Sequence, residues 1–262
     1  MSAAAEAGAR SSGSGGAGDP GGRRIAMWSG PRNLSTALMR SFESRGDTLV
    51  TDEPLYAHYL KVTGLAHPGA EEVIAVHDPD WRRVVSWLTG PVPGGKALWY
   101  QKHMTHHLLP GIERGWLGEL SNAFLLRDPR DVIPSLDAKF ARPSLADTGL
   151  SQQLEIFECV RAKTGRVPPV IDSADLLRDP PGMLRALCSA LGIPFTERML
   201  AWESGRRATD GVWAKHWYHN VERSTGFAPE RANHAPLADE LRPLVAESMP
   251  YYETLHAARL RP

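Results

Sequence analysis

Short apolar runs alternate with amphipathic segments along most of this chain, and this alternation restricts the possible folds more than any other feature of the sequence. Uncharged runs of three or four residues are typical of buried strands, whereas apolar residues that recur every three or four positions are typical of helices. Strands that alternate with helices form a parallel sheet that the helices cover. The sequence therefore predicts an α/β fold. Its expected strands are Ile25–Trp28, Thr48–Thr51, Ala97–Tyr100, Ala123–Leu126 and Pro169–Ile171.

The first helix is expected directly after the first strand. Its apolar residues recur with helical spacing from Leu34 to Phe42, and the side chain of Asn33 is expected to cap its amino end. Near the C-terminus, Pro243 and Pro250 are expected to prevent one long helix, because proline lacks the backbone N–H that a helix interior uses. Further helices are expected around residues 79–88, 129–140, 150–165 and 180–191.

The first 22 residues differ from the rest of the chain in composition. Six Ala, seven Gly and four Ser occupy 17 of these 22 positions. Such residues gain too little from burial to offset the entropy lost on ordering. We therefore expect a disordered tail over residues 1–22 and a single domain over residues 23–262. The tail has neither the apolar stretch of a secretory signal nor the arginines of a transit peptide.

Charge and cysteine content narrow the possible function classes. The chain carries 30 basic and 30 acidic residues, so its formal net charge is zero and no nucleic-acid partner is expected. Any anion-binding site must therefore be local. The two cysteines, Cys159 and Cys188, are too few for a disulfide scaffold and fit a reducing compartment. No run approaches the roughly 18 apolar residues of a membrane span, so the sequence predicts a cytoplasmic protein.

Ligands of parallel α/β sheets bind at the carboxyl ends of the strands, so functional residues are expected in the loops that follow strands. The first such loop, residues 28–36, offers the guanidinium of Arg32, the hydroxyls of Ser35 and Thr36 and the backbone N–H groups of a helix start. This group of donors favours an anion. The loop lacks the G-x-x-x-x-G-K-[ST] pattern of nucleoside-triphosphate sites. An ordinary strand–helix turn with an exposed Arg32 is the alternative.

A second loop of the same kind follows the fourth expected strand. Arg127 stands at the end of that strand, and Ser135 lies eight residues further on, about two turns into the next helix. The guanidinium and the hydroxyl are suited to share one anionic group. Alternatively, Asp128 and Asp131 pair with neighbouring arginines as a solvated charge cluster. Two separate anion sites favour a doubly phosphorylated cofactor.

These two loops resemble those of the P-loop sulfotransferases that use 3′-phosphoadenosine 5′-phosphosulfate (PAPS), particularly the carbohydrate-type and bacterial members. In that family a basic residue followed by Ser/Thr holds the 5′-phosphosulfate, and an R-[DN]-P-x-D-x-x-x-S stretch binds the 3′-phosphate. Residues 127–135 match that stretch at every fixed position. The resemblance implies a nucleotide-kinase-like P-loop fold and an enzyme that transfers a sulfuryl group from PAPS to a hydroxyl or amine. The implied cofactor-binding residues are Arg32, Asn33, Leu34, Ser35, Thr36, Arg127, Ser135 and Lys215.

The resemblance also implies catalytic residues. Glu53 belongs to a Glu-Pro-Leu segment whose glutamate is a proposed general base in carbohydrate-type enzymes, although Pro54 alone would explain a turn there. Lys102 stands where those enzymes often carry a basic residue, suited to stabilise charge on the leaving oxygens. His103 is expected to contact the acceptor. The resemblance spans about residues 24–195 and includes matches at 172–177 and 191–194. Residues 211–227, which include Lys215, occupy the place of the segment that closes over the nucleotide.

The residues leave two other functions open. One is an ATP-dependent P-loop phosphotransferase on a small metabolite, in which Asp172 would hold Mg²⁺. The other is a non-catalytic scaffold that keeps the nucleotide-binding loops. No metal site is predicted, because His103, His106 and His107 have helical spacing but no Cys or carboxylate beside them at ligand spacing.

The acceptor is expected to be a small molecule or a carbohydrate. Tyr56, His58, Tyr59 and Lys61 follow Glu53 and either line the acceptor pocket or pack in the interior. No heptad repeat or long apolar stripe favours a particular oligomeric state.

Overall fold

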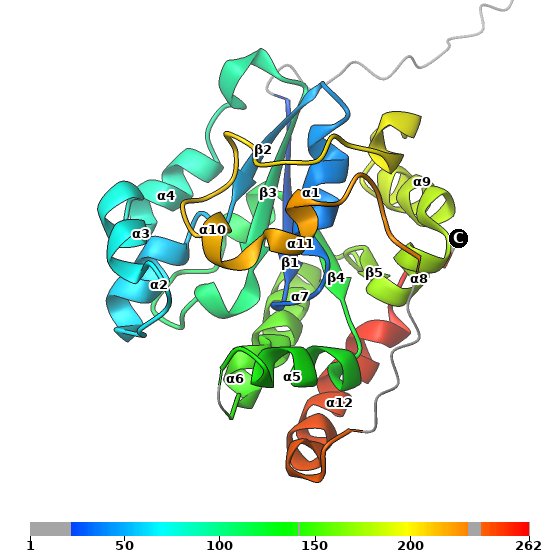
Figure 1. Ribbon diagram of the computed structural model, residues 1–262. Coiled ribbons are helices and arrows are strands. Elements are labelled where there is room, and N and C mark those ends of the chain that lie inside the picture. Colours follow the sequence, from blue (N-terminus) through cyan, green and yellow to red (C-terminus); the bar gives the residue numbers. More distant parts are fainter. Residues whose placement is uncertain (1–21, 141, 230–236, 262) are drawn as a thin grey trace, which may run out of the picture.

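The computed structural model describes residues 22–140, 142–229 and 237–261. Five strands form one sheet in the order β2-β3-β1-β4-β5, and every neighbouring pair is parallel, which confirms the predicted α/β fold (Figure 1). The tail expected at residues 1–22 lies outside the described residues, apart from Gly22. The strands are β1 (Arg23–Ser29), β2 (Thr48–Asp52), β3 (Leu98–Met104), β4 (Ser121–Leu126) and β5 (Val170–Asp172).

The helices that the sequence predicts all form, and the structure adds several short ones. None of the helices within the described ranges is long and apolar enough to cross a membrane. Their bounds are α1 (Ser35–Glu43), α2 (Tyr56–Thr63), α3 (Ala70–Val76), α4 (Trp81–Leu88), α5 (Pro129–Asp137), α6 (Leu145–Thr148), α7 (Leu150–Thr164), α8 (Ser173–Arg178), α9 (Pro180–Ala190), α10 (Ala214–Trp217), α11 (His219–Glu222) and α12 (Arg242–Ala257).

Both faces of the sheet are buried, which explains why β1 is apolar at consecutive positions. Side chains alternate along a strand, so Ile25 and Met27 join a core with α1 and α9, whereas Ala26 and Trp28 join a core with α4, α7 and α12. A third cluster packs α2 and α3 against α10, beyond the β2 edge (Figure 1). The helices therefore cover the faces of the sheet and leave the carboxyl ends of its strands for a ligand.

The C-terminal helix differs from the expectation. Pro243 and Pro250 were expected to prevent one long helix, and this is wrong because α12 contains both. Pro243 falls in the first turn, where its missing N–H needs no intrahelical partner. Pro250 interrupts one helical hydrogen bond, a cost of about 3 kcal/mol. The burial of Tyr252 and Leu255 in the core shared with α7 offsets that cost.

Candidate functional site

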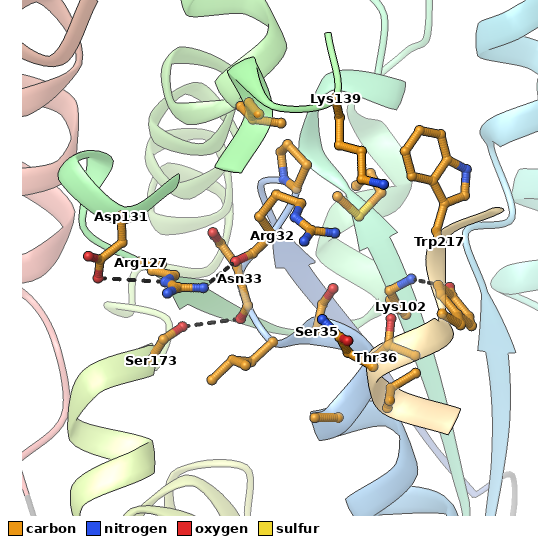
Figure 2. A pocket seen from close by; sticks show the side chains of 18 of the residues that line it. Arg32, Asn33, Ser35, Thr36, Lys102, Arg127, Asp131, Lys139, Ser173 and Trp217 are labelled. Atoms are coloured by element: carbon orange, nitrogen blue, oxygen red, sulfur yellow. Dashed lines mark hydrogen bonds and ion pairs between the residues drawn. The ribbon is translucent and has the colours of Figure 1, made fainter. Parts of the chain in front are cut away.

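A cavity of about 1280 Å³ lies at the carboxyl edge of the sheet, and we call it the strand-end cavity (Figure 2). This is the edge where parallel α/β sheets bind their ligands. Its volume exceeds the roughly 300–1,000 Å³ of usual small-molecule sites, so it has room for a nucleotide and a second substrate. All five strands contribute lining residues within three positions of their carboxyl ends, among them Arg32, Glu53, Lys102, Arg127 and Ser173.

The loop between β1 and α1 has an unusual backbone. Arg32 has a φ of 62° and Leu34 a φ of 63°, in the left-handed region that most residues avoid. Such residues cost about 1–3 kcal/mol each and concentrate at binding sites. Ser35 and Thr36 line the cavity as the first residues of α1, so the positive end of this helix dipole borders it.

The expectation that Asn33 caps α1 is wrong. Leu34 is the N-cap, and no side chain supplies the cap hydrogen bond. The Asn33 side chain is buried instead, and its Nδ2 donates to the carbonyl oxygen of Leu125 at 3.3 Å. Ser173 Oγ donates to the backbone oxygen of Asn33 at 3.1 Å (Figure 2). Asn33 therefore ties the loop to the ends of β4 and β5, which fixes the strained backbone.

The structure brings together the residues expected to bind the two ends of the cofactor. Arg127 Nη1 donates to the backbone oxygen of Arg32 at 3.0 Å, and Arg32 Nε donates to Ser135 Oγ at 2.8 Å. Burial lowers the pKa of Arg32, and the charge of Arg127 lowers it further. Two guanidinium groups this close repel each other, so an anion between or beside them would relieve the repulsion.

The acidic residues of the second loop form ion pairs with arginines of the same loop. Asp128 caps α5 by accepting from the backbone N–H of Arg130 at 2.8 Å, and its carboxylate also pairs with the exposed Arg130 side chain. Asp131 lies 3.7 Å from Arg127 Nε. Both pairs of the alternative charge cluster therefore form, and all four residues line the cavity, where Figure 2 shows Arg127 beside Asp131.

Glu53 is the carboxylate at the end of β2. It has a φ of 41° although Pro54 follows, and proline favours an extended preceding residue, so this backbone is strained. Its side chain is 12% exposed, and Oε1 accepts from Lys102 Nζ at 2.6 Å. Burial raises the pKa of Glu53, opposed by the charge of Lys102 and assisted by that of Asp52. A raised pKa brings a carboxylate closer to the value that favours general-base catalysis near neutral pH.

Lys102 lies within β3, two residues before its end, although the apolar run that predicts this strand stops at Tyr100. Its side chain is 1% exposed, and Nζ also donates to Asp52 Oδ1 at 2.8 Å and to Tyr218 Oη at 2.7 Å. The two carboxylates and Tyr218 hold the pKa of Lys102 well above its usual value, although burial alone would lower it. Lys102 is therefore charged at any physiological pH.

Aromatic rings form the wall of the cavity next to Glu53. Tyr56 stacks on His107 with ring centres 4.7 Å apart, and Tyr59 packs against the same imidazole at 4.7 Å. Phe140 and Trp217 continue the wall, 5.7 Å apart. Both alternatives for the segment after Glu53 hold in part, because Tyr56 and Tyr59 line the cavity and are also largely buried. His58 bonds a backbone oxygen and Lys61 is exposed, and neither is among the described lining residues.

Two residues expected at the site are not brought to it. His103 is 1% exposed, stacks on Trp28 at 4.3 Å and is not among the described residues that line the cavity. Because β3 continues to Met104, consecutive side chains point to opposite faces, and only Lys102 can face Glu53. Burial lowers the pKa of His103 to about 3, so it stays neutral. The structure thus corrects the expected contact between His103 and the acceptor.

Lys215 is the second of these residues. It lies in α10 and pairs with Glu72 of α3 at the surface. It is absent from the cavity lining within the described ranges. The structure therefore does not support nucleotide binding by Lys215, because the ion pair with Glu72 of α3 holds its side chain at the surface. Other residues of the expected closing segment, including Trp217, Tyr218 and Arg223, do line the cavity.

Comparison with known proteins agrees with this geometry. A family model described as "Sulfotransferase domain" matches residues 23–259. The chain belongs to the sulfotransferase domain family. Two Arabidopsis thaliana proteins, named Branched-chain-amino-acid aminotransferase-like protein 1 and protein 2, share 37% identity over 233 residues and 39% over 204 residues with it. The alignments cover 89% and 78% of this chain but 41% and 36% of those proteins, so it spans about two-fifths of their length.

Among solved structures, a sulfotransferase from Alicyclobacillus acidocaldarius matches this family member with a TM-score of 0.52 at 14% identity. The match covers 91% of this chain and 97% of that one. A likeness at this identity concerns the fold alone. Together with the family match, it confirms the expected sulfotransferase-type fold.

Sequence reasoning missed several residues that line the cavity or contact its lining. Asp52 and Tyr218 complete the environment of Lys102, and Lys139, two residues after the end of α5, points into the cavity (Figure 2). The sequence marks His107 only by its spacing from His103 and His106, which is that of a possible metal site. Asp52 adjoins Glu53 and could have been found as a second polar residue at a strand end, whereas nothing marks Tyr218 in the sequence.

Proposed function

We propose that this chain transfers a sulfuryl group from PAPS to a hydroxyl or amine of a small-molecule or carbohydrate acceptor. The link between the two loops supports this proposal more than any other observation. Arg32 and Arg127 both line one cavity, and Arg127 bonds the backbone of Arg32. Ser135 is not among the described lining residues, but the Arg32 side chain donates to its hydroxyl, which keeps it next to both arginines. A nucleotide with phosphate groups at two positions suits such a pair. Membership of the sulfotransferase family supports the same reaction.

The cavity divides into two sides under this proposal. Arg32, Ser35 and Thr36 hold the 5′-phosphosulfate at the start of α1, and Arg127 with Ser135 holds the 3′-phosphate. Ser135 exchanges its bond with Arg32 for one with the phosphate. The acceptor packs on the aromatic wall, because flat apolar faces of small rings and of sugars both stack on aromatic side chains.

The reaction is an in-line displacement at sulfur. The acceptor oxygen or nitrogen forms a bond to sulfur while the bond between sulfur and the phosphate oxygen breaks, and 3′-phosphoadenosine 5′-phosphate (PAP) leaves. Glu53 takes the proton of the acceptor, and Arg32 with the N–H groups of α1 stabilises the charge that develops on the leaving phosphate. The products are a sulfated acceptor, PAP and one proton on Glu53.

The alternative phosphotransferase has less support. It needs Asp172 as a magnesium ligand, but this carboxylate caps α8 by accepting from Ala174 N at 2.8 Å and also accepts from Tyr252 Oη at 3.0 Å. The plant relatives are named for an aminotransferase-like protein, and this chain matches about two-fifths of their length. Because the sulfotransferase model spans residues 23–259, we propose sulfuryl transfer for this part.

PAP is expected to stabilise the protein in the absence of Mg²⁺. At a concentration of 100 times Kd, a ligand adds about 2.7 kcal/mol to the free energy of unfolding, which a thermal-shift titration detects. Arg127→Ala should weaken PAP binding about tenfold or more, because a charge-assisted hydrogen bond is lost. Arg83→Ala removes an exposed arginine that pairs with Asp78 outside the cavity lining and should bind PAP normally. A shift that appears only with ATP and Mg²⁺ together would instead support the phosphotransferase.

The rate is expected to fall on acidification at a higher pH than for an ordinary glutamate. A general base works in its ionised form, and burial raises the pKa of Glu53, so the active form is lost as the pH falls through that raised value. The profile of kcat/KM against pH, measured as PAP released from PAPS, should show this acidic limb. A limb in the range of free glutamate would mean that Glu53 is not the base.

A further inference from the structure

The ammonium group of Lys102 has three N–H donors, and the structure assigns a partner to each of them. They donate to Asp52 Oδ1 at 2.8 Å, to Glu53 Oε1 at 2.6 Å and to Tyr218 Oη at 2.7 Å. The side chains of Lys102 and Asp52 are each 1% exposed. Lys102 lines the cavity, yet it has no donor left for the oxygens of a bound sulfuryl group.

Two of the partners of Lys102, Tyr218 and Asp52, form further hydrogen bonds. Tyr218 Oη donates to Asp52 Oδ2 at 2.6 Å and accepts a second hydrogen bond from Trp213 Nε1 at 3.2 Å. Asp52 Oδ2 also accepts from the backbone N–H of Gly211 at 3.3 Å. Tyr218 Oη thus uses its one donor and both of its lone pairs, and each oxygen of Asp52 accepts at least one hydrogen bond. We call Asp52, Lys102 and Tyr218 the lysine latch.

One carboxylate oxygen next to the lysine latch, Oε2 of Glu53, has no hydrogen-bond partner among the described residues. Glu53 Oε2 lies 4.0 Å from His107 Nδ1, too far for a hydrogen bond, and that nitrogen has no hydrogen-bond partner among the described residues. An acceptor hydroxyl fits between an open carboxylate oxygen and the aromatic wall. The two neighbouring carboxylates therefore have different tasks: Asp52 compensates the charge of Lys102, and Glu53 faces the substrate.

We propose that Lys102 is a positioning residue that orients Glu53, and that Asp52 and Tyr218 fix it in this task, so that Lys102 does not contact the transferred sulfuryl group. This inference rests on the proposed function. It also gives the segment after residue 210 a role, because two of the hydrogen bonds to Asp52 come from Gly211 and Tyr218. When the segment after residue 210 packs on the strand ends, it therefore helps to position Glu53 and also lines the cavity.

The first test compares the affinities for PAPS and PAP, which differ by the sulfuryl group. In Lys102→Met, we expect the ratio of the two affinities to stay within about twofold of the wild-type ratio, while turnover falls, because only Glu53 is misplaced. A lysine that contacted the sulfuryl group would contribute a charge-assisted hydrogen bond to PAPS alone, and its loss would reduce the ratio about tenfold or more. That selective loss of PAPS affinity would overturn the inference and leave the proposed function intact.

Lys102→Met leaves Asp52 and Glu53 as neighbouring buried carboxylates, so the fold itself is at risk. The double variant Asp52→Asn/Lys102→Met removes one charge of each sign and serves for the same ratio measurement. If wild-type protein binds neither nucleotide, the proposed function fails, and the second test below still decides whether the lysine latch exists.

The second test measures hydrogen exchange without any ligand. Tyr218→Phe removes the phenol that links the segment to Asp52 and Lys102, so the amides of α10 and α11 should exchange about tenfold faster or more. Tyr252→Phe is the matched control: it also removes a phenol that donates to a buried carboxylate, at Asp172, but outside this segment. It should leave the exchange of α10 and α11 unchanged. Equal exchange in Tyr218→Phe and wild type would overturn the latch.

Discussion

Glu53→Gln is expected to reduce turnover by about 10²–10⁴-fold while the affinities for PAPS and PAP change by less than about threefold. The amide keeps the shape of the side chain and can still accept from Lys102 Nζ, but it cannot take a proton from the acceptor. The nucleotide contacts proposed for Arg32, Arg127 and Ser135 do not involve this side chain. Turnover is measured as PAP released from PAPS with an acceptor chosen from a panel of small phenols, sugars and amines.

Glu197→Gln provides the matched control for this variant. Glu197 is exposed, pairs with Arg185 and is not among the described residues of the cavity lining, so turnover should stay at the wild-type level. Full turnover in Glu53→Gln would place the base elsewhere, and His107 is the nearest candidate, 4.0 Å from Glu53. A chain in which Glu53→Gln changes neither nucleotide binding nor biological activity would be the non-catalytic scaffold.

The part of the site that sequence reasoning could predict is the part that local patterns encode. Arg32 and Arg127 each follow a short apolar run, and the carboxyl ends of parallel strands meet at one edge of a sheet. Their contact follows because β1 and β4 are neighbours in the sheet. Glu53 is indicated instead by the resemblance of its Glu-Pro-Leu segment, and because β2 ends one residue before it, Glu53 lies at the same edge.

Strand length explains the main error in the candidate site. The apolar run of the third expected strand stops at Tyr100, but β3 continues through Gln101, Lys102 and His103 to Met104. Polar residues remain in this strand because they have hydrogen-bond partners. Gln101 Nε2 donates to the Leu88 carbonyl oxygen at 2.9 Å, and Lys102 Nζ donates to Asp52 in the lysine latch. A pattern of apolar residues cannot reveal strand residues that are stabilised by specific hydrogen bonds.

Contacts distant in sequence explain what was missed. Tyr218 and Asp52 are 166 positions apart and meet only because the segment after residue 210 crosses the carboxyl edge of the sheet. The same holds for the Lys215 pair with Glu72, which takes that lysine away from the cavity. Neither contact leaves a periodic signal in the sequence.

Helix α1 connects the cofactor loop with this segment. Its amino end borders the strand-end cavity, while Arg40, from its last turn, forms an ion pair with Asp210, directly before Gly211, whose backbone N–H donates to Asp52 of the lysine latch. Arg40 Nη2 lies 2.6 Å from Asp210 Oδ1, and both side chains are 1% exposed. Thr209 Oγ1 also donates to Glu43 Oε1 of α1 at 2.6 Å. The segment is therefore anchored to the same helix that presents its N–H groups to the cofactor.

Arg40→Met is expected to lower the free energy of unfolding by about 3–5 kcal/mol, because Asp210 would remain as a buried charge without its partner. Urea denaturation measures this loss. The double variant Arg40→Met/Asp210→Leu should recover much of it, since no isolated charge stays buried. Arg161→Met removes an exposed arginine that pairs with Glu158 and should change stability by less than about 0.5 kcal/mol. A loss in Arg40→Met no larger than in this surface variant would mean that the Arg40–Asp210 pair does not anchor the segment, and the position of Tyr218 would then depend on the lysine latch and the packing of α10 alone.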